Sequence, residues 1–226
     1  MKIPFSVYDF FGYLAVGFLV LVSLDYSSGG GWLLKDTIAP IYVLLWVVIA
    51  YIVGHIVAHI ASSLLEHLFL RKFLGSPEEH LFGDSTRTWK TKLFPATFKP
   101  FPKATQERIL ARAVECRAPK SGRALFFHCH AIVKHQAVTR DRMNIFLALY
   151  GFCRNTSMAS TLAACSLIVS HILFPSTAPD LIPWLPATLV VAVGMLYRYL
   201  KFFRHYTTEV FVSYADASPA AVNPKV

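Results

Sequence analysis

Charge is scarce in this chain, and acidic charge is scarcest. Only 15% of the 226 residues are Asp, Glu, Lys or Arg, against about 25% in a typical soluble domain. Apolar residues make up 55% of the sequence, and the mean hydropathy is +0.48. This composition argues against an ordinary soluble domain and favours a membrane protein.

Several motifs of catalysis and disulfide formation are also missing. The sequence has no Gly-rich phosphate loop, no nucleophile elbow and no H-E-x-x-H pattern. The four cysteines are Cys116, Cys129, Cys153 and Cys165, and they form no C-x-x-C pair. Cys153 and Cys165 fall in the third long helix expected from the apolar pattern. None of the cysteines is expected outside the cell, so we predict no disulfide. Because no C-x-x-C pair is present, we also predict no metal centre, and no motif indicates a cofactor.

What the chain does contain is long apolar segments. Each is long enough, or nearly so, to cross about 30 Å of hydrocarbon as a helix rising about 1.5 Å per residue. They are about Val7–Leu24, Ile41–Ala61, Thr156–Phe174 and Leu181–Leu200. The predicted fold class is therefore all-α, a polytopic membrane protein with four transmembrane helices.

The apolar helices are expected to continue beyond the bilayer. The second runs from Pro40 to about Leu74, the third begins near Asp141, and the fourth reaches about Tyr214. Between them, Phe94–Pro102 contains three prolines and is expected to be extended. A cytoplasmic helical hairpin should follow, with Thr105 capping a helix over Gln106–Arg117 and a second helix over Ala124–His135.

The chain is predicted to have four parts. Residues 1–70 hold helices one and two, 71–142 form a basic cytoplasmic loop, 143–214 hold helices three and four, and 215–226 form a disordered tail. The alternative that the first segment is a secretory signal is weaker, because its basic region is thin and no good cleavage site follows. Ser6 and Asp9 instead indicate a helix start, and an acid catalyst is the alternative role of Asp9.

The basic residues are concentrated in one loop. Between Arg71 and Arg142 lie 15 of the 22 Lys and Arg residues, whereas the two other loops hold only Lys35. The positive-inside rule then places both termini and the long loop in the cytoplasm. The expected partners are anionic lipid headgroups, with a cytoplasmic protein or nucleic acid as the alternative partner of the loop.

A stripe of polar side chains follows one side of the second helix. At about 100° per residue, these positions share a face: Tyr51, His55, His59, Ser62 and Glu66. Polar groups at such depth need partners. The stripe is predicted either to line a pore or proton path or to pack against other helices, and its spacing does not separate the two.

The lower end of the stripe is predicted to form an ion-pair node. Arg154 and Asn155 on the third helix and Arg198 on the fourth are the natural partners of Glu66. The node either fixes the register of the helices or binds an anion or lipid headgroup.

Two further clusters suggest chemistry more loosely. His128, Cys129 and His130, with Cys116 and His135 nearby, contain zinc-ligand types, but a two-residue spacing points side chains to different sides of a helix. Arg123 and His128 have the R-x4-H spacing of helical HEPN ribonucleases, without the usual polar residue after the Arg.

Several short segments together resemble a known family. They are the segments 6–14 (SVYDFFGYL), 54–55 (GH), 150–155 (YGFCRN), 199–204 (YLKFFR) and 209–211 (EVF). They are similar to a family of small four-helix bacterial inner-membrane proteins without an established activity, and the resemblance covers most of the chain. The sequence departs from the family's usual pattern at 15–17, where Ala-Val-Gly replaces an expected Pro-Gly pair.

The sequence is compatible with three candidate functions. In size and layout the chain also resembles membrane accessory proteins of bacterial immune systems, an architectural analogy only. The leading expectation is a non-enzymatic homo-oligomer that forms a pore or gated conduit in a bacterial stress or defence pathway. The alternatives are an anchor that holds a partner through the basic loop, and an enzyme, either a HEPN-like nuclease or a metal-dependent hydrolase using His55, His59 and Glu66.

Overall fold

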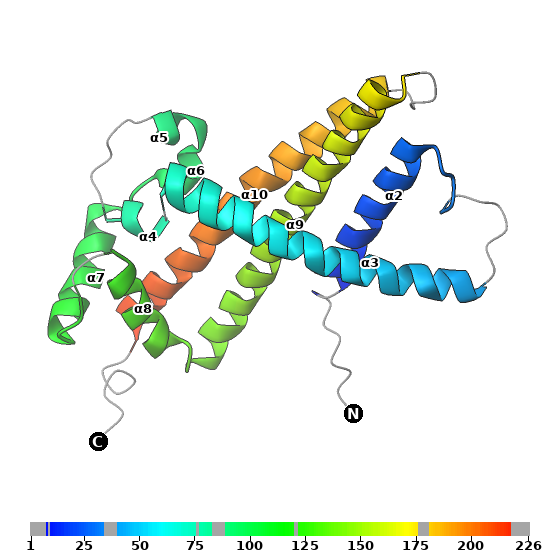
Figure 1. Cartoon of the computed structure of the whole chain (residues 1–226). Helices are drawn as coiled ribbons and strands as arrows, with labels where there is room; N and C mark the ends of the chain where they lie inside the picture. The colour runs from blue at the N-terminus through cyan, green and yellow to red at the C-terminus, as the bar shows by residue number, and fades with distance from the viewer. Residues whose placement is uncertain are drawn as a thin grey trace. The chain divides into compact units, whose positions relative to one another are not determined.

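Every element in the part of the chain that the structure describes is a helix (Figure 1). The computed structural model describes residues 8, 10–33, 40–75, 77–82, 89–119, 122–175 and 181–217. The apolar helices are η1 (Phe10–Ala15) continuing into α2 (Val16–Ser28), α3 (Pro40–Ala61) continuing into η2 (Ser62–Leu74), α9 (Ala137–Leu173) and α10 (Leu181–Asp216). The shorter helices are α4 (Pro77–His80), α5 (Trp89–Leu93), α6 (Pro95–Phe98), α7 (Lys103–Glu115) and α8 (Gly122–Val133).

The all-α class and the apolar helices agree with the sequence-based prediction. Among the described residues, 4 helices are long and apolar enough to cross a membrane: Phe10–Ser28, Ile41–Leu74, Ala137–Leu173 and Pro183–Asp216. The first ends at Ser28, later than predicted. Gly29 terminates it in the left-handed conformation (φ 67°), which glycine adopts without strain, and its amide donates to the carbonyls of Asp25 and Tyr26.

The chain forms two compact units. The first unit comprises Met1–Leu68 and Gly151–Tyr199, and the second comprises Phe69–Tyr150 and Leu200–Val226. Helices α9 and α10 therefore contribute to both, with their apolar halves in the first unit. The predicted part 71–142 lies wholly within the second unit, whereas the predicted part 143–214 is divided between the units, because the ends of both long helices cluster with the loop.

In the first unit, α2 and α3 meet backbone to backbone near the middle of α3 (Figure 1). A Cβ on Gly17 would overlap the carbonyl of Ala50, and one on Gly54 would overlap the carbonyl of Tyr13. Two glycines at one crossing therefore allow an approach that side chains would block. Around it lies a small core of Val16, Val20, Val57, Ala61, Met158 and Ala159.

Buried polar side chains join α9 to the other helices of the first unit. The hydroxyl of Ser157 donates to the carbonyl of Ala192 on α10 at 2.8 Å, and that of Ser170 donates to the carbonyl of Ser27 on α2. Each bond satisfies a hydroxyl that would be costly unpaired in an apolar environment.

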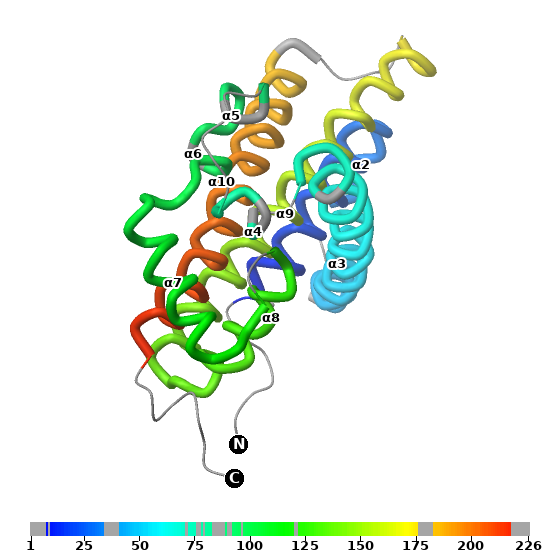
Figure 2. The backbone as a smooth tube through the Cα atoms, turned by 90° about the vertical axis from the view of Figure 1, so that its left-hand side faces the viewer, coloured from blue at the N-terminus to red at the C-terminus, as the bar shows by residue number. Residues whose placement is uncertain are grey.

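The second unit is a cluster of short helices around the C-terminal end of α10 (Figure 2). Its core combines residues of α7, α8, α9 and α10 with two residues of the connecting segments: Leu81, Phe101, Ile109, Ala113, Leu125, Cys129, Val133, Met143, Val210, Phe211 and Tyr214. The guanidinium of Arg204 donates to the carbonyl of Thr97 at 2.9 Å and so ties α10 to the end of α6.

Several predicted boundaries in this region were wrong. Pro95–Phe98 forms the short helix α6 instead of an extended segment, because Pro95 stands at its first position, where a missing N–H costs nothing. Helix α7 begins at Lys103, with Pro102 rather than Thr105 at its N-cap. The carbonyl of Pro102 accepts the amides of Thr105 and Gln106 at 2.9 and 3.1 Å, which starts the helix earlier.

Helix α9 starts at Ala137, so the region before Asp141 continues the helix. Helix α8 ends at Val133, before the predicted His135, and α10 continues to Asp216 in the segment expected to be tail. The amide of Ala217 bonds the carbonyl of Tyr214 at 3.3 Å. The remaining tail, and the predicted helix-start residues Ser6 and Asp9, lie outside the described residues.

Candidate functional site

The polar stripe does not lie on one uniform helix. Tyr51, His55 and His59 belong to α3, whereas Ser62 and Glu66 belong to the π-helix η2. In a π-helix the bonds run from i to i+5, so each turn is wider than in an α-helix. The assumption of 100° per residue is therefore wrong beyond Ala61. Ser62 and Glu66 nevertheless lie close, with Ser62 Oγ donating to Glu66 Oε2 at 3.4 Å.

The upper part of the stripe belongs to an aromatic cluster, which we define as Tyr8, Tyr13, Tyr51 and His55. The rings of Tyr13 and His55 are stacked, with centroids 4.0 Å apart and planes 15° apart. Tyr51 meets His55 edge-on at 4.6 Å, and Tyr8 meets Tyr13 edge-on at 5.4 Å. The imidazole of His55 is thus held by ring contacts from two helices.

The crossing glycines place this cluster. Because Gly54 has no side chain, the backbone of Tyr13 lies against it, and the Tyr13 ring reaches the next residue, His55. On α9, a Cβ on Gly151 would overlap the hydroxyl of Tyr8. Sequence reasoning noted Gly54 but missed Tyr8 and Tyr13 as partners. The only signal for them was the spacing of two tyrosines on the first helix.

Both imidazoles of α3 lie at the outside of the chain. His55 and His59 are exposed, and so are the neighbouring apolar residues Ile52 and Ile56. On a helix with the highest mean hydropathy of the four, 2.4, exposed imidazoles are the polar exception. They are accessible from outside to a proton, an ion or another protein surface.

The lower part of the stripe is an internal ion pair. Arg154 Nη1 donates to Glu66 Oε2 at 3.0 Å, and the two side chains are only 13% and 23% exposed. Arg154 Nε and Nη2 each lie 3.2 Å from Asn155 Oδ1. Fully buried Asn155 in turn donates from Nδ2 to the carbonyl of Gly12 at 3.0 Å. This chain of bonds links η2, α9 and η1 and neutralises the carboxylate.

Arg198, the fourth predicted member of the node, contacts α9 from α10. Its side chain bonds the thiol of Cys153 on α9. His205 and Glu209, which share its helical face, lie in the second unit. There the ring of His205 stacks on Phe146 at 5.7 Å, and Glu209 lies 3.5 Å from Arg142.

The zinc-ligand types near His128 are arranged as parts of the packing. Cys129 is buried in the core, and burial raises the pKa of its thiol to about 12. The pKa of His130 is lowered by burial, with the Lys134 charge adding to the effect. The ring of His128 meets Tyr214 edge-on at 5.8 Å. Within the described ranges, no three His, Cys, Asp or Glu residues group closely enough to hold a metal ion.

The R-x4-H pair is similarly engaged. The guanidinium of Arg123 lies over the ring of Phe127, 5.4 Å from its centroid, in a cation–π contact.

Comparison with protein families, curated proteins and solved structures found no match to this chain.

Proposed function

We propose that this chain is an integral protein of a bacterial inner membrane that self-associates through α3 and forms a conduit for protons or small cations. The observation that carries the proposal is the exposure of His55 and His59 on an otherwise apolar helix. An imidazole facing lipid lacks hydrogen-bond partners. Assembly with a second copy supplies such partners, either from the other chain or from water in a path between the chains.

The internal ion pair supports placing the conducting groups at the histidines. Glu66 already binds Arg154 and Ser62, so its charge is balanced within one chain. Imidazole exchanges protons near neutral pH and is the side chain suited to a proton relay. His55 and His59 are one helical turn apart, which spaces two such groups along the bilayer normal.

The orientation proposed here places both termini and the second unit in the cytoplasm. It is supported by the concentration of 15 of 22 Lys and Arg residues between Arg71 and Arg142. Single cysteines introduced in the loop before α3 and in the loop before α8 would be labelled by an impermeant maleimide from opposite sides of oriented membranes.

A flux assay tests the conduit. The protein is reconstituted in vesicles of phosphatidylcholine and phosphatidylglycerol with a trapped pH-sensitive dye, and a potassium diffusion potential drives protons inward. The doubly substituted variant His55→Ala, His59→Ala should fall to the rate of empty vesicles. Ile56→Ala, on the same exposed helix, should conduct normally. Absence of flux at every pH, with a monomeric mass in detergent, would contradict the proposal.

A second candidate function is an anchor for an acidic partner. The observation favouring it is a group of exposed basic side chains in the second unit: Arg117, Arg123, Lys134 and Arg140. Exposed cationic side chains attract anionic protein, nucleic acid or lipid headgroups. Replacing these four by Gln and comparing the captured partners with those of the natural chain separates the two functions, since an unchanged set counts against the anchor.

A further inference from the structure

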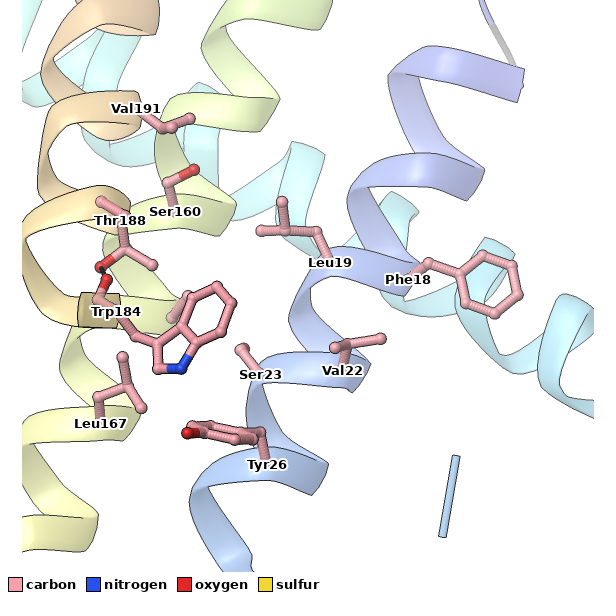
Figure 3. A pocket seen from close by; sticks show the side chains of 12 residues that line it. Phe18, Leu19, Val22, Ser23, Tyr26, Ser160, Leu167, Trp184, Thr188 and Val191 are labelled. Atoms are coloured by element: carbon pink, nitrogen blue, oxygen red, sulfur yellow. Dashed lines mark hydrogen bonds between the residues drawn. The ribbon is translucent and has the colours of Figure 1, made fainter. Parts of the chain in front are cut away.

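The first unit contains an apolar pocket on the side formed by α2, α9 and α10 (Figure 3). Its volume is about 550 Å³, within the range of ligand sites in proteins. The α2 side is formed by Phe18, Leu19, Val22, Ser23 and Tyr26. The other wall is formed by residues of α9 and α10, among them Leu167, Trp184 and Val191.

Small side chains create this space. Ser160 and Ala163 of α9, Ser23 of α2 and Ala187 of α10 all line it, and none reaches far from its helix. A void of this size deprives the surrounding side chains of contacts, and an apolar cavity of this kind is a poor site for water. The pocket is therefore suited to an apolar occupant.

Two hydroxyl groups of the lining are already engaged in bonds within their own helices. Ser23 Oγ donates to the carbonyl of Val20 at 2.8 Å, and Thr188 Oγ1 lies 2.9 Å from the carbonyl of Leu185. Among the described residues, the lining contains no Asp, Glu, Lys, Arg or His. A charged ligand would find no counter-charge, whereas a neutral hydrocarbon matches these walls along their length.

One end of the pocket has the side chains of a membrane interface. Tyr26 and Trp184 meet edge-on with centroids 5.9 Å apart, and Figure 3 shows them toward one end, with Ser160 and Val191 at the other. Rings with one polar atom favour the depth of the lipid headgroups. Both residues also lie close to helix ends, since α2 ends at Ser28 and α10 begins at Leu181.

The length of the pocket matches part of one leaflet. Phe18 to Tyr26 spans eight residues, or about 12 Å at the helical rise, and a leaflet holds about 15 Å of hydrocarbon. We propose that this pocket binds one acyl chain of a phospholipid from the leaflet at the Tyr26 and Trp184 end, whose headgroup lies beside those two rings. The site requires membrane insertion of the chain but not its self-association.

Photolabelling tests this site. The full chain is reconstituted in dioleoylphosphatidylcholine vesicles containing a trace of phosphatidylcholine with a diazirine in the middle of one acyl chain, irradiated, and mapped by mass spectrometry. Adducts at Leu19, Val22 and Val191 should exceed those at Val190 and Val193 by about threefold or more, because the pocket holds a chain in contact with three helices. Val190 and Val193 are 72% and 65% exposed and outside the pocket.

Filling the pocket supplies the decisive comparison. Ala187→Phe should bring labelling at the pocket positions down to the level of Val190, whereas Val190→Phe adds the same ring outside and should change nothing. Ser23→Leu fills the pocket from α2 if Ala187→Phe does not fold. Labelling that is uniform over all exposed helix faces would overturn the proposal. Labelling of the pocket by diazirine palmitate but not by the diazirine phosphatidylcholine would overturn it as well.

Two more outcomes keep the site separate from the conduit. If Ser23→Cys forms a disulfide with a second copy, the pocket is a contact between chains and the acyl-chain proposal fails. Proton flux in Ala187→Phe should equal that of the natural chain, because α3 is untouched. Uniform labelling with normal flux would reject the lipid site and leave the conduit standing.

Discussion

The ring of Tyr13 lies flat against the imidazole of His55, with centroids 4.0 Å apart and planes 15° apart. This contact joins the first helix to the exposed face of α3, and it depends on the backbone of Tyr13 lying against Gly54. The imidazole is thus fixed by the same crossing that holds the two helices together. A change that weakens the helix crossing should therefore also change the position of the His55 imidazole.

Tyr13→Ala should therefore both destabilise the first unit and loosen His55. Loss of the stacked ring should lower the free energy of unfolding by about 1 kcal/mol beyond the lost apolar contact, whereas Tyr13→Phe keeps the ring and should stay close to the natural value. Unfolding in mixed micelles by SDS measures this. Tyr42→Ala, at a 57% exposed aromatic of α3, is the control. Equal effects at both positions would deny the stacking a special role.

The helix crossing gives a sharper test. A Cβ on Gly54 or Gly17 meets backbone atoms that cannot rotate away, so Gly54→Ala and Gly17→Ala should each cost about 1–3 kcal/mol or more. Gly194→Ala is the matched control, because a Cβ there has nothing within 4 Å and alanine in a helix is better than glycine by up to about 1 kcal/mol. SDS unfolding should therefore show opposite signs. A stabilising Gly54→Ala would mean that the two backbones are not in contact.

Features that depend on local sequence could be predicted from the sequence alone, whereas contacts between distant segments could not. Apolar run length and Pro or Gly breaks were sufficient for four apolar helices and their extension, because these are local signals. The crossing at Gly17 and Gly54 was not predictable, since nothing local says which glycines face each other. The same limit applies to Glu66: a carboxylate in an apolar helix signals the need for a cation, but the 3.0 Å contact with Arg154 follows only from the packing of η2 against α9.

The widening of the helix at Ser62 was also beyond the sequence pattern. A periodic pattern assumes one period, and the segment Ser62–Leu74 contains no Pro or Gly to mark a change. The short helix α6 was missed for the opposite reason: proline density suggested extension, although a proline in the first turn is compatible with a helix.

The Arg154–Glu66 pair should behave as a partly buried ion pair. Arg154→Met removes the guanidinium that lies 3.0 Å from Glu66 and should cost about 1–3 kcal/mol, less than the roughly 3–5 kcal/mol of a fully buried pair. The double variant Arg154→Met, Glu66→Gln should cost less than the sum of the single changes. For comparison, Asp216→Asn breaks the Arg108 pair, whose side chains are 52% and 57% exposed, and should cost about 0–1 kcal/mol. Additive single changes in SDS unfolding would show that the pair is not coupled.

The buried thiol of Cys129 predicts a pH dependence of stability. Its pKa is about 12 in the folded chain because burial disfavours the thiolate, whereas an exposed thiol has a pKa of about 8.5. Below about pH 8.5 both states hold the proton and stability is unaffected by this group; above it the unfolded state alone loses the proton, so stability falls as pH rises toward 12. Cys129→Val keeps an apolar side chain of similar size without the proton and should flatten this alkaline decline. Chemical unfolding of both chains between pH 7 and 10 measures the difference, and parallel curves would show that Cys129 reaches solvent in the folded protein.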